Sequence, residues 1–523
     1  MWRTAFCWIA LLPLFAALTR LNKDGKPLTL MQGAVLGYAC GFVWYLGNCY
    51  WVYQTMYLYG GLAKPVAAGI LILFCLYLGL YHALFATLIV AFRRSWLGVQ
   101  GALLLAPFAW VAVELARARI TGFPWDLLGI AQVDNQLLTR LAPIAGAYGL
   151  SFVIAAVNAL WLVRISVRER RHTRTILTAV GVVIVVVYLF ALRHLEMPLD
   201  SPATATATLV QHNLGVGTEA NSTNESVQQL SSSFIKLSLH PGRTICNGIP
   251  ELASTHCAHS ADEPLVNPDG SPALPRMDLI VWPESPADFQ ERDAAFRQSI
   301  SALAGTEHAP VILGDLGVDA DPAVKRGYRL YNSANVVAAD GTFLGRYDKM
   351  HLVPFGEYVP FKQLFFFAGD LLGEVGSFDA GNHRSVFTTG GHAYGIFICY
   401  ESVFADEVRQ FVNNGAEVLV NISNDGWYGD TSAAWEHLAM VRMRAIENHR
   451  WILRSTNTGV TAAINPYGRV TASMPRHIRS SVNVAFGYED DITFYTAHGD
   501  LFAYTCALVT TLALGFSLTR KML

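Results

Sequence analysis

Charge is nearly absent from long parts of this 523-residue chain. Residues 5–19 contain no charged side chain, and residues 28–92 contain only Lys64 and His82. The net charge is −2 and no basic stripe is present, which argues against a nucleic-acid partner. A chain of this length can hold two or three domains. The uneven distribution of charge indicates that a large part of it lies in a membrane.

A spanning helix needs about 20 predominantly apolar residues. We identify seven candidate spans, at about 5–19, 28–50, 65–92, 97–116, 141–163, 176–194 and 500–519. The first is short enough for a signal peptide, but no Ala-x-Ala-like cleavage site follows it, so we expect a retained helix. The sequence therefore predicts an N-terminal transmembrane bundle (1–195, about six helices), a domain outside the membrane (196–499) and a C-terminal transmembrane helix (500–523).

Basic residues follow alternate spans, which predicts the orientation of the bundle. They follow the first span (Arg20, Lys23, Lys26), the third (Arg93, Arg94), the fifth (Arg164, Arg168, Arg170, Arg171, Arg174) and the last (Arg520, Lys521). By the positive-inside rule these loops are cytoplasmic. The large domain then lies on the opposite side, which is the periplasm of a bacterium.

The eight cysteines fall into three groups. Five lie in or beside candidate spans, where a thiol acts as a small apolar group: Cys7, Cys40, Cys49, Cys75 and Cys506. Cys246 and Cys257 lie in a polar stretch, where an oxidising compartment favours a disulfide. A metal site with His256 and His259 is the alternative, but the spacing matches no standard zinc pattern. Cys399 remains without a partner, and we expect neither a metal nor a cofactor.

From about residue 205 to 487, short β-rich runs alternate with helical stretches. Expected strands lie at 206–213, 279–282, 311–314, 335–338, 395–399 and 418–422, and expected helices at 291–304, 403–414 and 433–449. This alternation predicts a mixed α/β sheet covered by helices.

Three of the β-rich segments end in reactive side chains. The apolar run 394–398 stops at Cys399, the run 279–283 stops at Glu284, and Lys349 lies in a third segment of the same kind. A nucleophilic cysteine needs a base and a positive charge nearby to lower its pKa. The alternative interpretation is that Glu284 is an exposed carboxylate, Lys349 a surface lysine and Cys399 an inert thiol in the core.

The three segments carry Glu284, Lys349 and Cys399 in that order along the chain. This order, with the residues around each, resembles the nitrilase superfamily, which implies an αββα sandwich. With spans on both sides of that domain, the chain is similar to the membrane-embedded apolipoprotein N-acyltransferase family. The matching strings are 121–125, 282–284, 331–333, 349–360, 399–401, 423–430, 442–447 and 456–461.

This resemblance implies acyl transfer in two steps at the bacterial inner membrane. Glu284 acts as the base, Cys399 as the nucleophile that carries a thioester, and Lys349 stabilises the oxyanion. The donor is a membrane phospholipid, commonly phosphatidylethanolamine, and the acceptor is the α-amine of a diacylglyceryl-cysteine in an apolipoprotein. The supporting residues are Glu357, Tyr400, Glu401, Asn332, Trp427 and Trp125. We expect a monomer.

Phe365, Phe366 and Phe367 form a candidate lid, because three large apolar side chains are cheaper in acyl chains than in water. A helix packed on the domain core is the alternative. Three features depart from the family: seven spans where eight are usual, no tryptophan soon after 211–213, and an apparent insertion at 240–276.

Two other functions remain open on the sequence. One is a membrane-tethered amidohydrolase that uses the same three residues and water on a small carbon–nitrogen substrate. The other is a transporter or lipid-binding scaffold whose domain is catalytically inactive.

Overall fold

The computed structural model describes residues 2–166, 201–216, 225–240, 244–247, 256–259, 277–284, 287–358 and 378–519. The chain forms two compact units. Unit 1 contains Met1–Tyr50, Ala68–Leu199 and His498–Leu523, and unit 2 contains Trp51–Ala67 and Asp200–Ala497. The division at 195 and 499 expected from the sequence stays a prediction.

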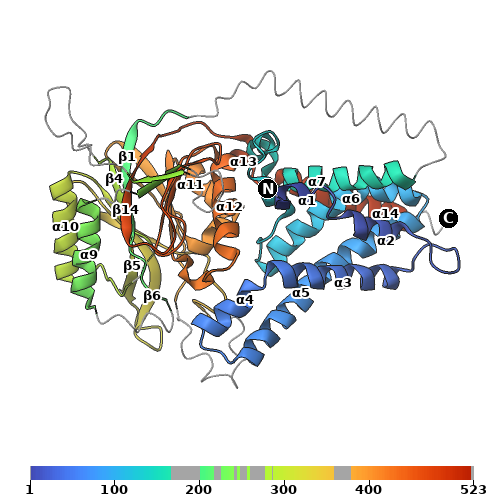
Figure 1. Ribbon diagram of the computed structural model, residues 1–523, viewed down its shortest axis with the longest axis horizontal. Coiled ribbons are helices and arrows are strands. Elements are labelled where there is room, and N and C mark those ends of the chain that lie inside the picture. Colours follow the sequence, from blue (N-terminus) through green and yellow to red (C-terminus); the bar gives the residue numbers. More distant parts are fainter. Residues whose placement is uncertain are drawn as a thin grey trace. The chain divides into compact units, whose positions relative to one another are not determined.

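Unit 1 is helical (Figure 1). Its helices include α1 (Trp2–Phe6), α2 (Leu12–Thr19), α3 (Leu30–Asn48), most of α5 (Lys64–Arg94), α6 (Gly98–Ala116), α7 (Ala142–Ser166) and α14 (Leu501–Thr519). Among the described residues, five helical stretches are long and apolar enough to cross a membrane: Leu30–Asn48, Lys64–Arg94, Gly98–Thr121, Leu138–Val163 and Leu501–Thr519. The candidate span at 176–194 lies outside the described residues.

The expectation of one continuous span at 5–19 is wrong. The segment forms two short helices, α1 and α2, separated by turns. Pro13 has no amide hydrogen, so it cannot continue a helix that begins upstream and instead lies at the start of α2. The Leu11 amide donates to the buried Asn158 side chain at 3.0 Å, outside any helical pattern.

Helix α3 packs closely on α5 through glycines spaced four residues apart. A Cβ atom at Gly37 would lie 2.4 Å from the His82 carbonyl oxygen, and one at Gly33 would lie 2.6 Å from the Val90 side chain. Small residues on one helix face let two backbones approach in this way, as they do in membrane bundles.

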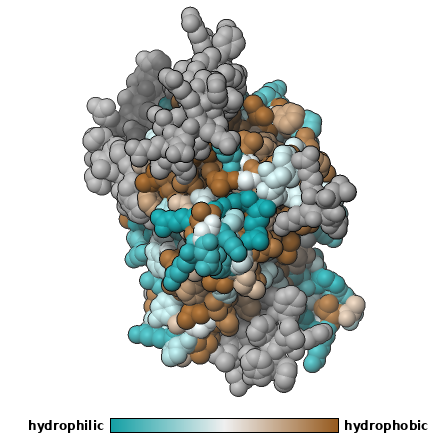
Figure 2. Space-filling view, turned by 90° about the vertical axis from the view of Figure 1, so that its right-hand side faces the viewer, coloured by the Kyte–Doolittle hydropathy of each residue, from teal (hydrophilic) through white to brown (hydrophobic). Residues whose placement is uncertain are grey.

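The outer surface of unit 1 carries many large apolar side chains. Figure 2 shows one face of the molecule, where apolar residues lie above and below a band of hydrophilic ones. Exposed apolar residues on the long helices include Val43, Leu73, Leu104, Leu512 and Phe516. Such a surface is suited to lipid, since each of these side chains gains roughly 1.5–3 kcal/mol on leaving water.

Unit 2 contains two β-sheets. The six-stranded sheet has the order β14 (Ser480–Phe486), β1 (Ala205–Gln211), β4 (Leu279–Val281), β5 (Val311–Ala320), β6 (Tyr328–Val337) and β7 (Phe343–Asp348). The eight-stranded sheet has the order β3 (His256–His259), β2 (Thr244–Asn247), β13 (Val470–Ser473), β12 (Ala462–Ile464), β11 (Ile452–Thr456), β10 (Val418–Ser423), β9 (His392–Ile398) and β8 (Val386–Thr389).

Helices cover the two sheets. Helices α9 (Val227–Leu239) and α10 (Ala294–Glu307) lie on the side of the six-stranded sheet, and α11 (Ala405–Asn413) and α12 (Ala433–Asn448) lie on the other side (Figure 1). Buried apolar residues such as Phe234, Trp282 and Phe296 fill the space between the first pair of helices and their sheet. The expected αββα sandwich is confirmed.

Parallel strands position the reactive side chains. Strand β4 is parallel to β1 and β5, and β9 is parallel to β10, which is parallel to β11. Polar residues follow three of these strands: Glu284 lies three residues after the end of β4, Cys399 directly follows β9 and Asn424 directly follows β10. The carboxyl end of a parallel strand is the usual place for functional residues in such sheets.

Most of the expected insertion at 240–276 lies outside the described residues. Its two short strands are antiparallel, and the backbone of Cys246 is directly opposite that of Cys257. The disulfide between them stays a prediction.

Candidate active site

Four of the expected site residues form one buried hydrogen-bonded cluster. Lys349 Nζ donates to Glu284 Oε1 at 3.1 Å and to Glu357 Oε1 at 2.9 Å. Asn332 Nδ2 donates to the same two oxygens, at 2.7 Å each. Lys349 is only 1% exposed. Burial by itself would lower the pKa of Lys349, but the Glu284 and Glu357 carboxylates hold it well above its usual value.

Backbone groups fix the orientation of these side chains. The Lys349 amide donates to the Asn332 carbonyl at 2.9 Å, which aligns the end of β7 with β6. Glu357 Oε2 accepts the Val353 amide at 2.7 Å, and Glu284 Oε2 accepts the Asn424 amide at 2.7 Å. Each carboxylate therefore has its two oxygens held by different partners, and neither is free to rotate.

Cys399 begins the short helix η7 (Cys399–Val403), directly after β9. Its φ of 49° is the left-handed conformation that non-glycine residues rarely adopt. The thiol is buried and lies within electrostatic range of both Glu284 and Lys349. The structure therefore brings all three expected residues into one site.

The acidity of Cys399 differs from the sequence-based expectation. Burial raises the pKa of the thiol well above its usual value, the Glu284 charge raises it further, and the Lys349 charge opposes both effects. Because the two raising effects are stronger, the resting residue is a neutral thiol and not a thiolate. Its proton must leave as the nucleophile reacts.

Glu401 links the two reactive strand ends. One oxygen accepts the Ile398 amide at 2.7 Å, just before Cys399, and the other accepts the Met350 amide at 2.6 Å, just after Lys349. Tyr347 Oη donates to the same carboxylate at 2.7 Å. Burial raises the pKa of Glu401 to about 7, although these three donors and Lys349 oppose the shift. Tyr400 is buried and packs edge-to-face on Phe404.

The other expected residues have different positions. Trp427 is 43% exposed and lies edge-to-face against Tyr59. Trp125 belongs to unit 1, where it is fully buried and stacks on Phe123. Phe365, Phe366 and Phe367 lie outside the described residues.

Sequence reasoning missed a second layer behind Cys399. His437 of α12 and Arg454 of β11 both contact Asp425, and His437 also contacts the Cys399 carbonyl. The string 423–430 is one of the family-like strings, and it identifies Asp425 as a polar residue after a strand. No pattern in the sequence joins Asp425 to the two distant partners.

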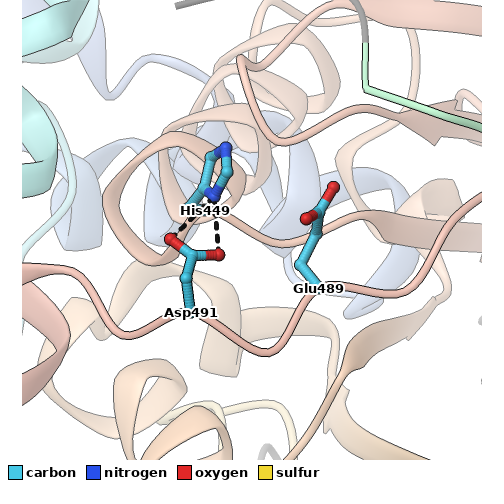
Figure 3. Close-up of side chains that lie close together, drawn as sticks. All are labelled: His449, Glu489 and Asp491. Carbon is cyan, nitrogen blue, oxygen red and sulfur yellow. Dashed lines mark hydrogen bonds and ion pairs between the residues drawn. The ribbon is translucent and has the colours of Figure 1, made fainter.

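One group of side chains among the described residues has the spacing of metal ligands: His449, Glu489 and Asp491 (Figure 3). His449 Nδ1 lies 2.8 and 2.9 Å from the two oxygens of Asp491, and Arg450 Nη1 lies 3.4 Å from the same carboxylate. These contacts are those of an ion-pair network, which already compensates the charge of Asp491.

The chain is similar to known proteins over both of its parts. Residues 3–160 match the model of the apolipoprotein N-acyltransferase N-terminal domain, and residues 238–484 match the carbon-nitrogen hydrolase model. The chain is 31% identical to the apolipoprotein N-acyltransferase of Geobacter metallireducens, over 98% of this chain and 91% of that protein. It is also 31% identical to the enzyme of the same name from Methylococcus capsulatus, over 93% and 87%. Among solved structures, Saccharomyces cerevisiae Nit3, of the nitrilase superfamily, aligns with 56% of this chain and 94% of its own, at 14% identity and a TM-score of 0.37.

Proposed function

Because the chain belongs to the apolipoprotein N-acyltransferase family, we propose that it transfers an acyl chain from a membrane phospholipid to the N-terminal amine of an apolipoprotein through a Cys399 thioester. The observation that carries the mechanism is the buried lysine between two carboxylates in the same site as the buried Cys399 thiol.

The geometry of this cluster places Glu284 as the proton acceptor. Glu284 and Glu357 both contact Lys349 Nζ, and Glu284 lies within electrostatic range of the Cys399 thiol. Glu284 is therefore placed to accept the Cys399 proton as the sulfur attacks.

In the first step the Cys399 thiol loses its proton to Glu284 and the sulfur bonds to the carbonyl carbon of a phospholipid ester. Lys349 has three N–H donors, of which its described partners occupy two, so one remains for the oxyanion. The tetrahedral intermediate collapses and the ester C–O bond breaks. The lysophospholipid leaves as an alcohol with the proton from Glu284, and an acyl thioester remains on Cys399.

In the second step the acceptor amine attacks the thioester carbon. An α-amine has a pKa of about 7.7–8.0, so a substantial neutral fraction exists near neutral pH. Glu284 takes the amine proton, the C–S bond breaks, and the proton returns to the sulfur. The products are an amide and the free Cys399 thiol, so the enzyme ends in its starting state.

The identities of both lipids and the location belong to the same proposal. The donor is phosphatidylethanolamine, the acceptor is a diacylglyceryl-cysteine and the enzyme is a monomer. Five helices in the described part of the chain are long and apolar enough to cross a membrane, which suits substrates that are both held in lipid. The distribution of basic residues supports an inner-membrane enzyme whose catalytic domain lies in the periplasm.

Intact-protein mass spectrometry tests the proposal. The protein is incubated in vesicles of phosphatidylethanolamine with a labelled acyl chain, and the expected adduct maps to Cys399, is released by hydroxylamine, and moves to a diacylglyceryl peptide with a free amine. Cys399→Ala abolishes the adduct, whereas Cys506→Ala, which changes a buried thiol in α14, keeps it. Release of acid from small amides without any adduct would instead identify a hydrolase.

A further inference from the structure

A fully buried ionic network lies behind the nucleophile. Asp425 Oδ2 accepts Arg454 Nη2 at 2.6 Å, and Asp425 Oδ1 lies 2.9 Å from His437 Nδ1. The side chains of all three residues are 0% exposed. They come from three successive elements: η8 (Asp425–Tyr428), α12 and β11. Such an arrangement is expensive to bury, so its charges must be closely paired.

The network reaches the nucleophile through His437. Its Nε2 lies 3.0 Å from the Cys399 carbonyl oxygen. A carbonyl oxygen only accepts hydrogen bonds, so Nε2 carries the hydrogen and donates it. Asp425 contacts the other ring nitrogen and thereby fixes the orientation of the imidazole. The Tyr428 and His437 rings also meet edge-to-face, at a centroid distance of 5.6 Å.

The residue that receives this hydrogen bond is strained. For an L-residue such as Cys399, a left-handed backbone costs about 1–2 kcal/mol and persists only where its surroundings enforce it. The His437 bond restrains the Cys399 carbonyl, and the Glu401–Ile398 bond restrains the end of β9 one residue before Cys399. Together they restrain the backbone on the two sides of the nucleophile.

Ser423 ties the network to the end of β10. Its hydroxyl donates to Asp425 Oδ1 at 2.7 Å, and Ser423 is fully buried. The carboxylate behind the nucleophile is therefore held by three partners: Ser423, His437 and Arg454.

We propose that His437, anchored by Asp425 and Arg454, is a positioning residue that fixes the Cys399 carbonyl so that the thiol faces Glu284. This inference rests on the proposed function of Cys399 as the nucleophile. His437 touches no reacting atom and takes no proton from the substrate. Its contribution is geometric, and a displacement of about 1 Å at a reacting atom can lower a rate by about 10²-fold.

Matched histidine variants of the full-length protein test the proposal. His437→Asn removes the donor to Cys399, because asparagine is too short to reach the carbonyl. His437→Gln restores an N–H donor at a similar reach. His449→Asn is the control, since His449 caps the carboxyl end of the same helix and pairs with Asp491 at 2.8 Å without a bond to Cys399.

Three quantities are measured for each variant: the single-turnover rate of thioester formation in phosphatidylethanolamine vesicles, KM for the phospholipid, and Tm. His437→Asn should lower the rate at saturating lipid by about 10–100-fold with KM unchanged, and His437→Gln should recover a large part of it. His449→Asn should match the unsubstituted protein. A His437→Asn rate equal to the control, or a loss that glutamine does not recover, overturns the proposal.

A second measurement separates this inference from the proposed function. Alkylation of Cys399 by iodoacetamide, followed at the peptide level, depends on the thiol and needs no phospholipid. If the unsubstituted protein forms no thioester, the proposed function fails, and alkylation still decides the role of His437. Slower alkylation of His437→Asn than of His449→Asn supports the positioning role, and equal rates overturn it.

Discussion

At the residue scale, Asp315 in β5 is a buried acid outside the reaction. It is 0% exposed, and its Oδ2 accepts Asn335 Nδ2 at 2.7 Å. Burial raises the pKa of Asp315 to about 7 from an ordinary value of 3.8. Between those two values the folded chain holds a proton that the unfolded chain has lost. The contribution of this group to stability therefore falls as the pH rises from about 4 to about 7.

We predict that Asp315→Asn removes this loss of folding stability at higher pH. Asparagine stays neutral, so the variant should gain Tm relative to the unsubstituted protein at pH 8, and the difference should be smaller at pH 5. The free-energy gain at pH 8 should be at most a few kcal/mol, since one pKa unit corresponds to about 1.4 kcal/mol. The measurement is thermal unfolding in detergent at both pH values. A Tm difference that does not change with pH would contradict the prediction.

Glu357 is the second carboxylate that holds Lys349. In Glu357→Gln the lysine loses its charged partner at 2.9 Å, so its ammonium group is held less firmly where the oxyanion forms. We therefore expect kcat to fall by about 10-fold or more, with a smaller change in KM. The control is Asp319→Asn, which removes a half-exposed ion pair with Arg346 at 2.8 Å and should change kcat little. Steady-state kinetics that show equal effects for both variants would rule out this role.

Residues at the ends of apolar runs were accessible to sequence reasoning, because a strand that stops at a polar group is a local pattern. Glu284, Lys349 and Cys399 are of this kind. The acidity of Cys399 was not accessible, since it depends on burial and on charges contributed by other segments. The pairing of Asp425 with His437 and Arg454 was hidden for the same reason, because the three residues meet only through the packing of α12 on the sheet.

At the element scale, the close packing of α11 on β9 supports the strand that ends at Cys399. A Cβ atom at Gly395 would lie 2.7 Å from the Phe411 Cβ and 2.9 Å from the Ala416 Cβ. A larger side chain would force the helix away from the strand, and such overpacking costs about 1–3 kcal/mol. We predict that Gly395→Val lowers Tm and, by displacing the end of β9, also lowers the rate of thioester formation.

The control for this variant is Gly305→Ala in α10. A Cβ atom there has nothing within 4 Å, and alanine is the better helix former by about 0.5–1 kcal/mol. This variant should keep or raise Tm and leave the rate unchanged. A Gly395→Val protein as stable and as active as Gly305→Ala would show that the strand end tolerates a displaced helix.

The elements themselves were predictable to different degrees. Parallel strands with their following helices were recognisable, because apolar runs and helical periodicity alternate along the chain. Strand β14 was not recognised, although it pairs antiparallel with β1 over seven residues, because that pairing joins the two ends of the domain. The break between α1 and α2 was missed because composition alone reports the apolar character of a segment and not the effect of Pro13 on helix continuity.

At the scale of the whole molecule, the basic loops predict which side of the membrane each segment occupies. A reporter fused after Arg171 should read cytoplasmic, and one fused near Ser260 should read periplasmic. Paired alkaline phosphatase and fluorescent-protein fusions at each position provide the measurement, since the two reporters are active on opposite sides. The reverse pattern would overturn the proposed orientation and place the acyl-transfer site in the cytoplasm.

A short segment from the N-terminal part of the chain also belongs to unit 2, and nothing in the sequence predicts this. Residues Trp51–Ala67 lie between two apolar helices, yet they belong to unit 2. Trp51 is 8% exposed and packs edge-to-face on Tyr428 at a centroid distance of 5.4 Å. Thr55 Oγ1 donates to the Trp427 carbonyl at 2.9 Å. This short segment therefore supports η8, which holds Asp425 behind the nucleophile.

We predict that Trp51→Ala loosens η8 and slows thioester formation. Removing a large buried aromatic side chain costs about 3–5 kcal/mol in a well-packed core, and the cavity would lie directly against Tyr428. Hydrogen exchange of the peptide that contains residues 425–430 should become faster, and the rate should fall with it. Leu58→Ala, which truncates an exposed side chain in the same segment, should change neither. If Trp51→Ala speeds exchange but keeps the full rate, η8 does not need this support to present Asp425, and the catalytic site depends on the strands alone.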